Sequence, residues 1–420
     1  MITFQRLALV RLLSLRVLLL VMLPFAGGVN AGQAVDIYKA EVLVKNQSEA
    51  ERNAAARASF GELIVRVSGQ RAAISHPAIQ QALPNAQNYL FGFAYKSSAD
   101  KIIEEGKSLS ATGLQLNFEP RAIEKLLRDA QLPLWPATRP KVLVWLVAKG
   151  PAGLRVVPQP ADIQAMQAQA SYRGLPLVFA DADLEANDLW SANLEKIKAA
   201  SLHYKADAIL VGRYAPSSIG SIPVPSSSLS NEALDTASTS LNGLGPWVGD
   251  WQLVHADSIQ SFNDETPEAS GLFSSAIDRA ADYFANQYAI TPTNQGPQSI
   301  VLRVRNIASF GAFKEAQRYL DELAMVQRME VVTVNSDGLL VRLNVEGDTK
   351  LLLSTLALGR RLVPEAAATA PATDIDAEAM AELDQALATE NGISPQAPVS
   401  AAAPTHAGTL EDPLIFVWQK

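Results

Sequence analysis

The sequence predicts a protein of mixed α/β and α+β class. We expect a small N-terminal α+β domain at residues 35–133, a central α/β domain with a mixed sheet at residues 141–290, and a C-terminal ferredoxin-like or related βαββα domain at residues 298–363. Two observations predict it. Continuous apolar runs separated by helical patterns are typical of strands covered on both faces, and the order strand, helix, strand, strand, helix is typical of small α+β sandwiches. The apolar runs lie at residues 142–147, 175–179 and 208–211.

The composition limits the classes of function. Of the 420 residues, 48% are hydrophobic and 19% are charged, which is typical of a globular protein with room for several cores. The net charge is −8, and no cluster of lysine and arginine stands out, so nucleic acid is not expected as the main partner. The absence of cysteine excludes disulfides, thiolate metal sites and cysteine nucleophiles.

Residues 1–31 have the three parts of a secretory signal peptide. Arg6, Arg11 and Arg16 form the positive end, and an apolar core of about ten residues follows. That core is shorter than the roughly 20 residues that span a bilayer, and no later stretch reaches that length. We therefore expect cleavage after Ala31 and a mature chain in the periplasm without a transmembrane segment. An uncleaved anchor is the alternative.

The N-terminal region has the pattern strand, helix, short helix, strand, strand, helix. Ser48 and Glu51 predict a capping box, with Glu51 reaching back to the start of the helix, and Gly69 predicts where that helix ends. Two of the strands are expected to be joined by a polar loop. The expected strands lie at residues 35–44, 88–95 and 109–118, and the later helices at 77–83 and from Pro120.

In the central region, the apolar run in residues 205–214 is expected to be a core strand next to the two earlier runs. It leads into a flexible serine-rich loop at residues 217–246, so we expect the following strand, from Trp247, to pair with it antiparallel. Trp247 and Trp251 lie on one face of that strand, where core packing is favoured over a ligand platform. A long helix is expected from Thr266 onward.

The third region is expected to contain a strand, a helix capped by Ser309, a hairpin and a final helix that begins at Asp348. The hairpin is predicted from Asn335-Ser-Asp-Gly338, a strong turn signal between two apolar alternating segments. The Ala/Pro-rich residues 364–412 are expected to be disordered. Residues 413–419 are strand-like, and we expect them to pair with the sheet of the third domain.

The sequence predicts no catalytic, cofactor-binding or metal-binding residue. The four histidines have no metal-binding spacing, and no phosphate-binding or nucleophile motif is present. Ser98-Ala-Asp-Lys101 matches a short lysine-activated serine pattern, but it lacks the companion motifs. Asp181-Ala-Asp-Leu-Glu185 begins like a calcium loop, yet alanines replace the required glycine and glutamate. An acidic turn is the favoured interpretation of this segment.

Several segments together resemble a family of exported proteobacterial proteins, domain of unknown function family 2066. The resemblance covers most of residues 35–360 and implies no activity, cofactor or site residue. It is carried by Val35-Asp-Ile-Tyr38, Phe60-Gly-Glu-Leu-Ile-Val-Arg-Val-Ser-Gly69, Arg173-Gly-Leu-Pro-Leu-Val178, Ala206-Asp-Ala-Ile-Leu-Val-Gly-Arg213 and the strand of Trp247 and Trp251.

Three hypotheses about function remain open at this stage. The favoured one is a non-catalytic binding or accessory protein that serves a protein partner in the cell envelope. A second is a small-molecule or peptide binder that uses an exposed sheet edge. The third is a periplasmic hydrolase whose paired carboxylates come from separate segments. The candidate carboxylates are those of Asp181, Asp183, Asp188, Asp207 and Asp250.

Overall fold

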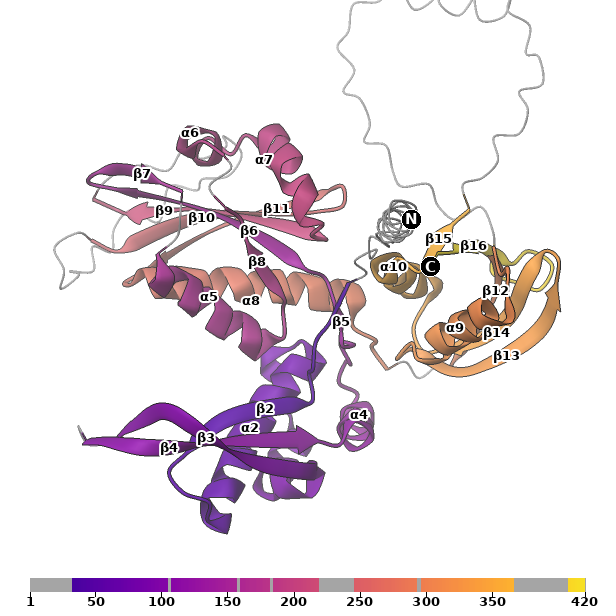
Figure 1. Ribbon diagram of the computed structural model, residues 1–420, viewed down its shortest axis with the longest axis horizontal. Helices are drawn as coiled ribbons and strands as arrows, with labels where there is room; N and C mark the ends of the chain where they lie inside the picture. The colour runs from indigo at the N-terminus through magenta and orange to yellow at the C-terminus, as the bar shows by residue number, and fades with distance from the viewer. Residues whose placement is uncertain are drawn as a thin grey trace, which may run out of the picture. The chain divides into compact units, whose positions relative to one another are not determined.

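The computed structural model describes residues 32–104, 107–156, 159–181, 184–218, 245–292, 296–365 and 407–419. The predicted signal peptide, most of the serine-rich loop, most of the Ala/Pro-rich segment and Asp183 lie outside these residues. The described residues form three sheets of three or more strands, each packed on its own core (Figure 1). The fold is of mixed α/β and α+β class, as predicted.

The N-terminal sheet has the strand order β2-β4-β3, and both pairs are antiparallel. The long helix α2 packs on it, and its buried face includes Phe60, Ile64 and Val67. This part of the chain consists of β2 (Lys39–Val44), α2 (Glu49–Ser68), η1 (Arg71–Ser75), α3 (Pro77–Ala82), η2 (Leu83–Tyr89), β3 (Leu90–Glu104), β4 (Lys107–Phe118) and α4 (Pro120–Asp129).

The prediction of a polar loop between the last two strands of this sheet is wrong. Strand β3 continues to Glu104 and β4 begins at Lys107, so the two strands form a long ribbon. The register shifts between Ser97 and Lys101, which places the short serine–lysine motif on a bulged strand. Backbone pairing forms this ribbon without an alternating apolar pattern, which explains why the sequence did not indicate it.

The ends of α2 follow the predicted caps only in part. Ser48 is the N-cap, and its side chain accepts a hydrogen bond from the Glu51 N–H at 3.3 Å. The Glu51 carboxylate accepts from the Lys45 N–H at 3.3 Å, so the reciprocal half of the predicted capping box is not formed. The helix ends at Gly69, whose φ of 73° is the left-handed conformation that favours glycine.

The central sheet contains the predicted core strand, β9 (Ala208–Pro216). It lies between β6 (Val142–Gly150), to which it is parallel, and β10 (Trp247–His255), to which it is antiparallel. The predicted change from parallel to antiparallel pairing at this strand is therefore confirmed. The remaining strands are β7 (Gly153–Arg155), β8 (Leu177–Phe179), which is parallel to β6, and β11 (Ser258–Thr266), which extends β10 to give the order β11-β10-β9-β6-β7.

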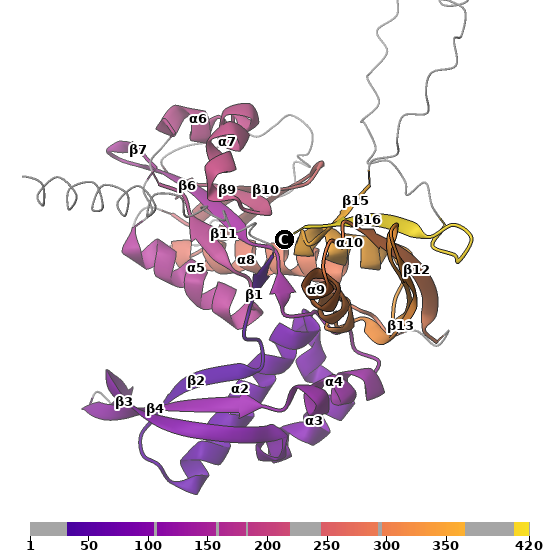
Figure 2. The same ribbon diagram turned by 45° about the vertical axis from the view of Figure 1, so that its right-hand side comes forward.

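Helices cover both faces of the central sheet. Both ribbon views show α5 (Pro160–Arg173) and α8 (Ala269–Tyr288) on one face, and α6 (Ala186–Trp190) and α7 (Leu194–Ser201) on the other (Figures 1 and 2). Alternate residues of β9 enter separate cores, Leu210 on the α8 face and Val211 on the α7 face. Burial on both faces is the physical reason for the continuous apolar run. Trp251 is fully buried, and Trp247 packs on the same core, as predicted.

The third sheet has the order β13-β14-β12-β16-β15. The predicted hairpin is confirmed, because Asn335 pairs with Gly338 at its turn. The predicted C-terminal strand is also confirmed, since β16 pairs parallel with β12 and antiparallel with β15. The elements are β12 (Gln298–Arg305), α9 (Phe310–Asp321), β13 (Val326–Asn335), β14 (Gly338–Val345), α10 (Thr349–Gly359), β15 (Leu362–Pro364) and β16 (Leu414–Trp418).

Helix α10 contributes to two cores. Leu352 and Leu356 belong to the core of the third sheet, whereas Leu358 packs in the core of the central sheet. The Leu358 carbonyl also accepts a hydrogen bond from the Gly32 N–H at 2.9 Å, just before β1 (Gln33–Ala34) pairs with β5 (Thr138–Arg139). The C-terminal end of α10 is therefore held next to the central sheet, where it forms one wall of the cleft described below.

Candidate functional site

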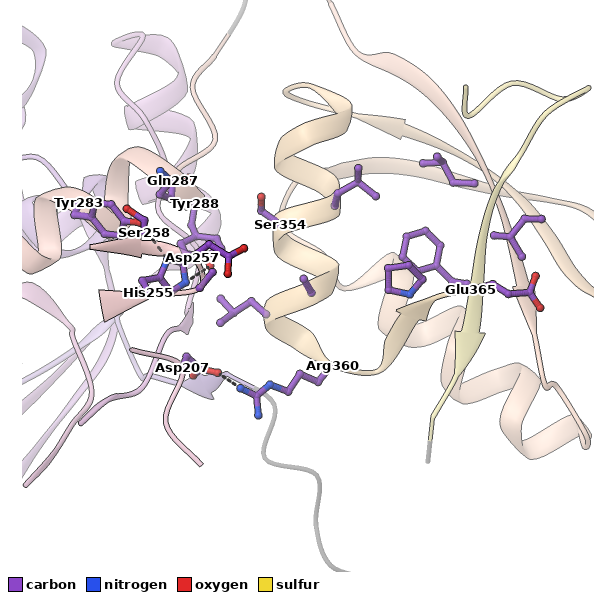
Figure 3. Close-up of a pocket in the computed structure, with 18 residues that line it drawn as sticks. Asp207, His255, Asp257, Ser258, Tyr283, Gln287, Tyr288, Ser354, Arg360 and Glu365 are labelled. Carbon is purple, nitrogen blue, oxygen red and sulfur yellow. Dashed lines mark hydrogen bonds and ion pairs between the residues drawn. The ribbon is translucent and has the colours of Figure 1, made fainter. Parts of the chain in front are cut away.

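A cleft of about 850 Å³ lies where the end of the β10–β11 hairpin meets α10. One side is formed by the hairpin end and the last turns of α8, and the other by α10, β15 and β16 (Figure 3). The wall on the α10 side is mostly apolar and includes Leu353, Ala357 and Leu358. The opposite side contributes polar groups, so a ligand in the cleft would contact two chemically different surfaces.

A half-buried polar group of the cleft is the imidazole of His255, the last residue of β10. Its Nδ1 lies 3.2 Å from the Tyr283 hydroxyl and its Nε2 lies 3.2 Å from the Tyr288 hydroxyl. A neutral imidazole has one N–H donor and one acceptor nitrogen, so one tyrosine donates to the ring and the other accepts from it. Both ring nitrogens therefore already have partners.

Burial determines the charge states of His255 and Tyr288. It lowers the pKa of His255 below the ordinary value of 6.5, and the opposing effect of the Asp207 carboxylate is smaller. Burial, with help from Asp207 and Tyr283, raises the pKa of Tyr288 to about 12. The imidazole and the Tyr288 hydroxyl are therefore both neutral at neutral pH.

An ion pair closes one end of the cleft. Arg360 follows α10 in the left-handed conformation, with a φ of 51°, and its Nη2 lies 2.7 Å from Oδ1 of Asp207. The other carboxylate oxygen of Asp207 accepts a hydrogen bond from the Lys141 N–H at 2.8 Å. Asp207 thus binds both the backbone at the start of the core strand and the side chain of Arg360.

The candidate carboxylates do not form a pair in the described part of the chain. Asp188 lies 2.9 Å from Nζ of Lys196 and Asp250 is paired with Arg213, whereas Asp207 is paired with Arg360. The backbone N–H of Asp181 donates to the Tyr204 hydroxyl at 2.8 Å. Among the described residues, no three His, Asp or Glu side chains form a group that could hold a metal ion.

The structure brings together another pair of acids, which was not predicted from the sequence. Asp278 and Asp282 lie one turn apart on α8, and both are bound by the fully buried Arg173 at 2.6 Å. Arg71 approaches the same two carboxylates at 3.2 and 3.3 Å. Arg173 also donates to the Gly69 carbonyl at 2.8 Å. The four-residue spacing of the acids was visible in the sequence, but the arginines that neutralise them come from distant segments.

Arg173 joins three separate segments of the chain. It extends from the end of α5 to α8 and to the C-cap of α2. Its buried guanidinium donates to acceptors of these two elements, which burial removes from water. Two of the segments that carry the family resemblance, those ending at Gly69 and beginning at Arg173, meet at this point. The geometry supports a role in packing, because both acids are fully engaged by cations.

Comparison with known families concerns only the N-terminal part of the chain. Residues 31–136 match the model of a domain of unknown function, DUF8605. No curated protein and no solved structure matches the chain. The match supports the prediction of an uncharacterised family for this region, but it does not show the predicted family 2066.

The DUF8605 region includes the β2-β4-β3 sheet and helix α2, and it ends near Trp135. All residues that line the cleft follow it in the chain, from Asp207 onward. The family match therefore carries no information about the cleft. In the described part of the chain, no helix is both long and apolar enough to cross a membrane.

Proposed function

We propose that the mature chain is an exported, non-catalytic binding protein of the cell envelope and that the cleft beside His255 is its ligand site. The cleft volume carries this proposal, because about 850 Å³ lies in the range of small-molecule and peptide pockets, roughly 300–1,000 Å³. The export part of the proposal rests on the N-terminal sequence pattern and on the resemblance to the exported family 2066.

The groups in the cleft favour a ligand with an apolar body and an uncharged hydrogen-bonding group. Of its charged side chains, Asp207 is neutralised by Arg360 at 2.7 Å, and Glu365 is neutralised by Arg305 at 2.6 Å. An anionic ligand group would have to break one of these pairs, and the remaining acid of the lining, Asp257, is exposed, so solvent screens its charge. The hydroxyls of Tyr283 and Tyr288 can instead rearrange their hydrogen bonds to a ligand, while the apolar face of α10 excludes water.

The same geometry disfavours a hydrolase. A general base needs a free acceptor within hydrogen-bond reach of the substrate, but both nitrogens of His255 are already bound to tyrosine hydroxyls. The carboxylates of Asp188, Asp207 and Asp250 are held by separate cations, so no two of them share a proton. Binding of an uncharged ligand needs no free base and leaves these ion pairs in place.

A neutral fluorescent probe tests the binding site. Titration of the mature chain with N-phenyl-1-naphthylamine should give saturable fluorescence with one probe per chain. Ala357→Trp fills the cleft from the α10 side and should weaken binding at least tenfold. Ala161→Trp adds the same side chain at an exposed position of α5 outside the cleft and should leave binding unchanged. Equal affinity in both variants would place the probe elsewhere.

Export is tested separately. Sequencing of the N-terminus of the protein recovered from a bacterial periplasmic fraction should begin at Gly32, and crosslinking in intact envelopes should capture a reproducible protein partner. Recovery only in the cytoplasm with Met1 retained would contradict the export proposal. That result would not contradict the proposed ligand site.

A further inference from the structure

Strand β11 forms an open edge of the central sheet. It pairs with β10 over all nine residues without a register shift, from Trp247 opposite Thr266 to His255 opposite Ser258. In the described part of the chain, no other strand pairs with β11. Alternate backbone N–H and C=O groups along an edge strand point away from the sheet and are available to another strand.

The other edge strands in the described regions are less suited to pairing. Strands β3 and β13 each contain two register shifts, and β7 and β15 have only three residues each. Strand β2 is shorter than β11 and carries Lys39 and Glu41. Bulges, short length and charges are the common protections of sheet edges against pairing. Residues 258–263 of β11 contain no charge and no proline.

We propose that β11 pairs antiparallel with β11 of a second copy of the chain, which gives a symmetric dimer with a continuous sheet. Full overlap of the nine residues places Phe262 on the two-fold axis. Asp264 then lies opposite Gln260, and Glu265 lies opposite Ile259, so no like charges face each other. Full overlap therefore selects the register centred on Phe262, and an axis shifted to Asp264 or Glu265 would in addition oppose like charges directly.

The side chains next to the axis favour this arrangement. Asp264 is already neutralised, because its carboxylate lies 2.9 Å from Nη2 of Arg279 and accepts from the Ser275 hydroxyl at 2.8 Å. The Arg279 guanidinium also lies 5.3 Å from the centre of the Phe262 ring. Ile259 has 46% of its surface exposed, and the partner strand would cover part of it. Apart from Glu265, which lies opposite Ile259 in this register, the strand presents hydrogen-bonding and apolar groups.

The dimer would also complete the rim of the cleft. In this register Thr266 of the second copy lies opposite Ser258, which is one of the residues that line the cleft. Each cleft would thus have the end of the other copy's β11 beside it. The dimer does not depend on the proposed ligand, so failure of probe binding leaves it standing, and loss of the dimer does not refute the ligand site.

The absence of cysteine makes a crosslinking test specific. The double variant Ser261→Cys/Asn263→Cys places each new thiol opposite its counterpart in the second copy, so mild oxidation should give a disulfide-linked dimer in high yield. The matched control is Arg328→Cys/Glu330→Cys, which has the same spacing on the exposed edge strand β13, and it should stay monomeric. Equal crosslinking of both variants would overturn the proposal.

Charge reversal tests the register. Ile259→Glu would face Glu265 of the second copy at both symmetric positions and should raise the dimer dissociation constant about tenfold in analytical ultracentrifugation. Adding Glu265→Lys should restore the dimer. A wild-type chain that sediments as a monomer at every concentration would refute the proposal. A dimer whose dissociation constant is unchanged by both substitutions would also refute the proposal. Disulfide crosslinking of a different protein through the thiol introduced at position 261 would refute it as well.

Discussion

The C-terminal strand β16 should be essential for the third sheet, because it is an internal strand of that sheet. It lies between β12 and β15, and its inward side chains, Leu414, Phe416 and Trp418, each have only 2% of their surface exposed. Deletion of residues 414–420 would remove all three and expose the partners that they cover. The strand reaches this position from a distant part of the chain, so the deletion leaves the rest of the domain's sequence intact.

The expected loss is large compared with the stability of a domain. Burial of one large apolar side chain contributes about 1.5–3 kcal/mol, so the three together contribute roughly 5–9 kcal/mol. A whole domain is stable by only about 5–15 kcal/mol. The deletion should therefore abolish the cooperative unfolding of the third sheet, or lower its melting temperature by more than about 10 °C. Differential scanning calorimetry of the full chain measures this directly.

A point variant distinguishes packing from the mere presence of the strand. Phe416→Ala should cost about 3–5 kcal/mol, because the ring is enclosed in the core. Ile415→Ala on the opposite face of β16 is the matched control, and its partly exposed side chain should cost about 1 kcal/mol. If the deletion or Phe416→Ala leaves the melt unchanged, the pairing of β16 in this sheet is refuted.

Three further predictions concern packing and protonation. Gly212→Ala should cost about 1–3 kcal/mol in urea unfolding, because its Cβ would lie 2.2 Å from the Trp251 ring, whereas Gly150→Ala, with nothing within 4 Å, should be near neutral. Arg173→Met should cost about 3 kcal/mol, since it leaves two carboxylates on α8 without their buried partner; a loss below 1 kcal/mol would contradict the packing role. The pKa of His255 should lie below 6.5 in an NMR titration. The unfolded chain then binds this proton more readily, so stability should fall as the pH drops below about 6.5, and His255→Gln should reduce that dependence.

The elements that the sequence predicted well have a local physical cause. The apolar run ending in Val211 is continuous because both faces of β9 are buried, and Gly69 ends α2 because the chain turns there with a positive φ. The hairpin at Asn335 follows from its turn residues. The ribbon of β3 and β4 was not predicted, because its outer part has no such local signal. Backbone pairing stabilises it, and side chains such as Ile103 stay exposed.

The candidate site could not be predicted, because it is assembled from distant segments. His255, Tyr288 and Arg360 are each unremarkable in their local sequence, and only the approach of α10 to the end of the β10–β11 hairpin makes them neighbours. The acidic residues selected as possible catalysts were chosen by type, and the structure assigns each described one a different partner. Which acids share an environment depends on helix and strand packing, and the sequence of one segment carries no such information.

The sequence by itself determined the fold class, the two ends of the long helix at Ser48 and Gly69, the change of strand direction at β9 and the strand character of the C-terminus. These follow from burial patterns and turn chemistry, which act over a few residues. Only the tertiary structure decided that β16 enters the middle of a sheet, that Arg173 holds Asp278 and Asp282, and that a cleft opens beside His255. Those features depend on contacts between residues that are distant in the chain, where packing and desolvation, rather than local propensity, determine which groups meet.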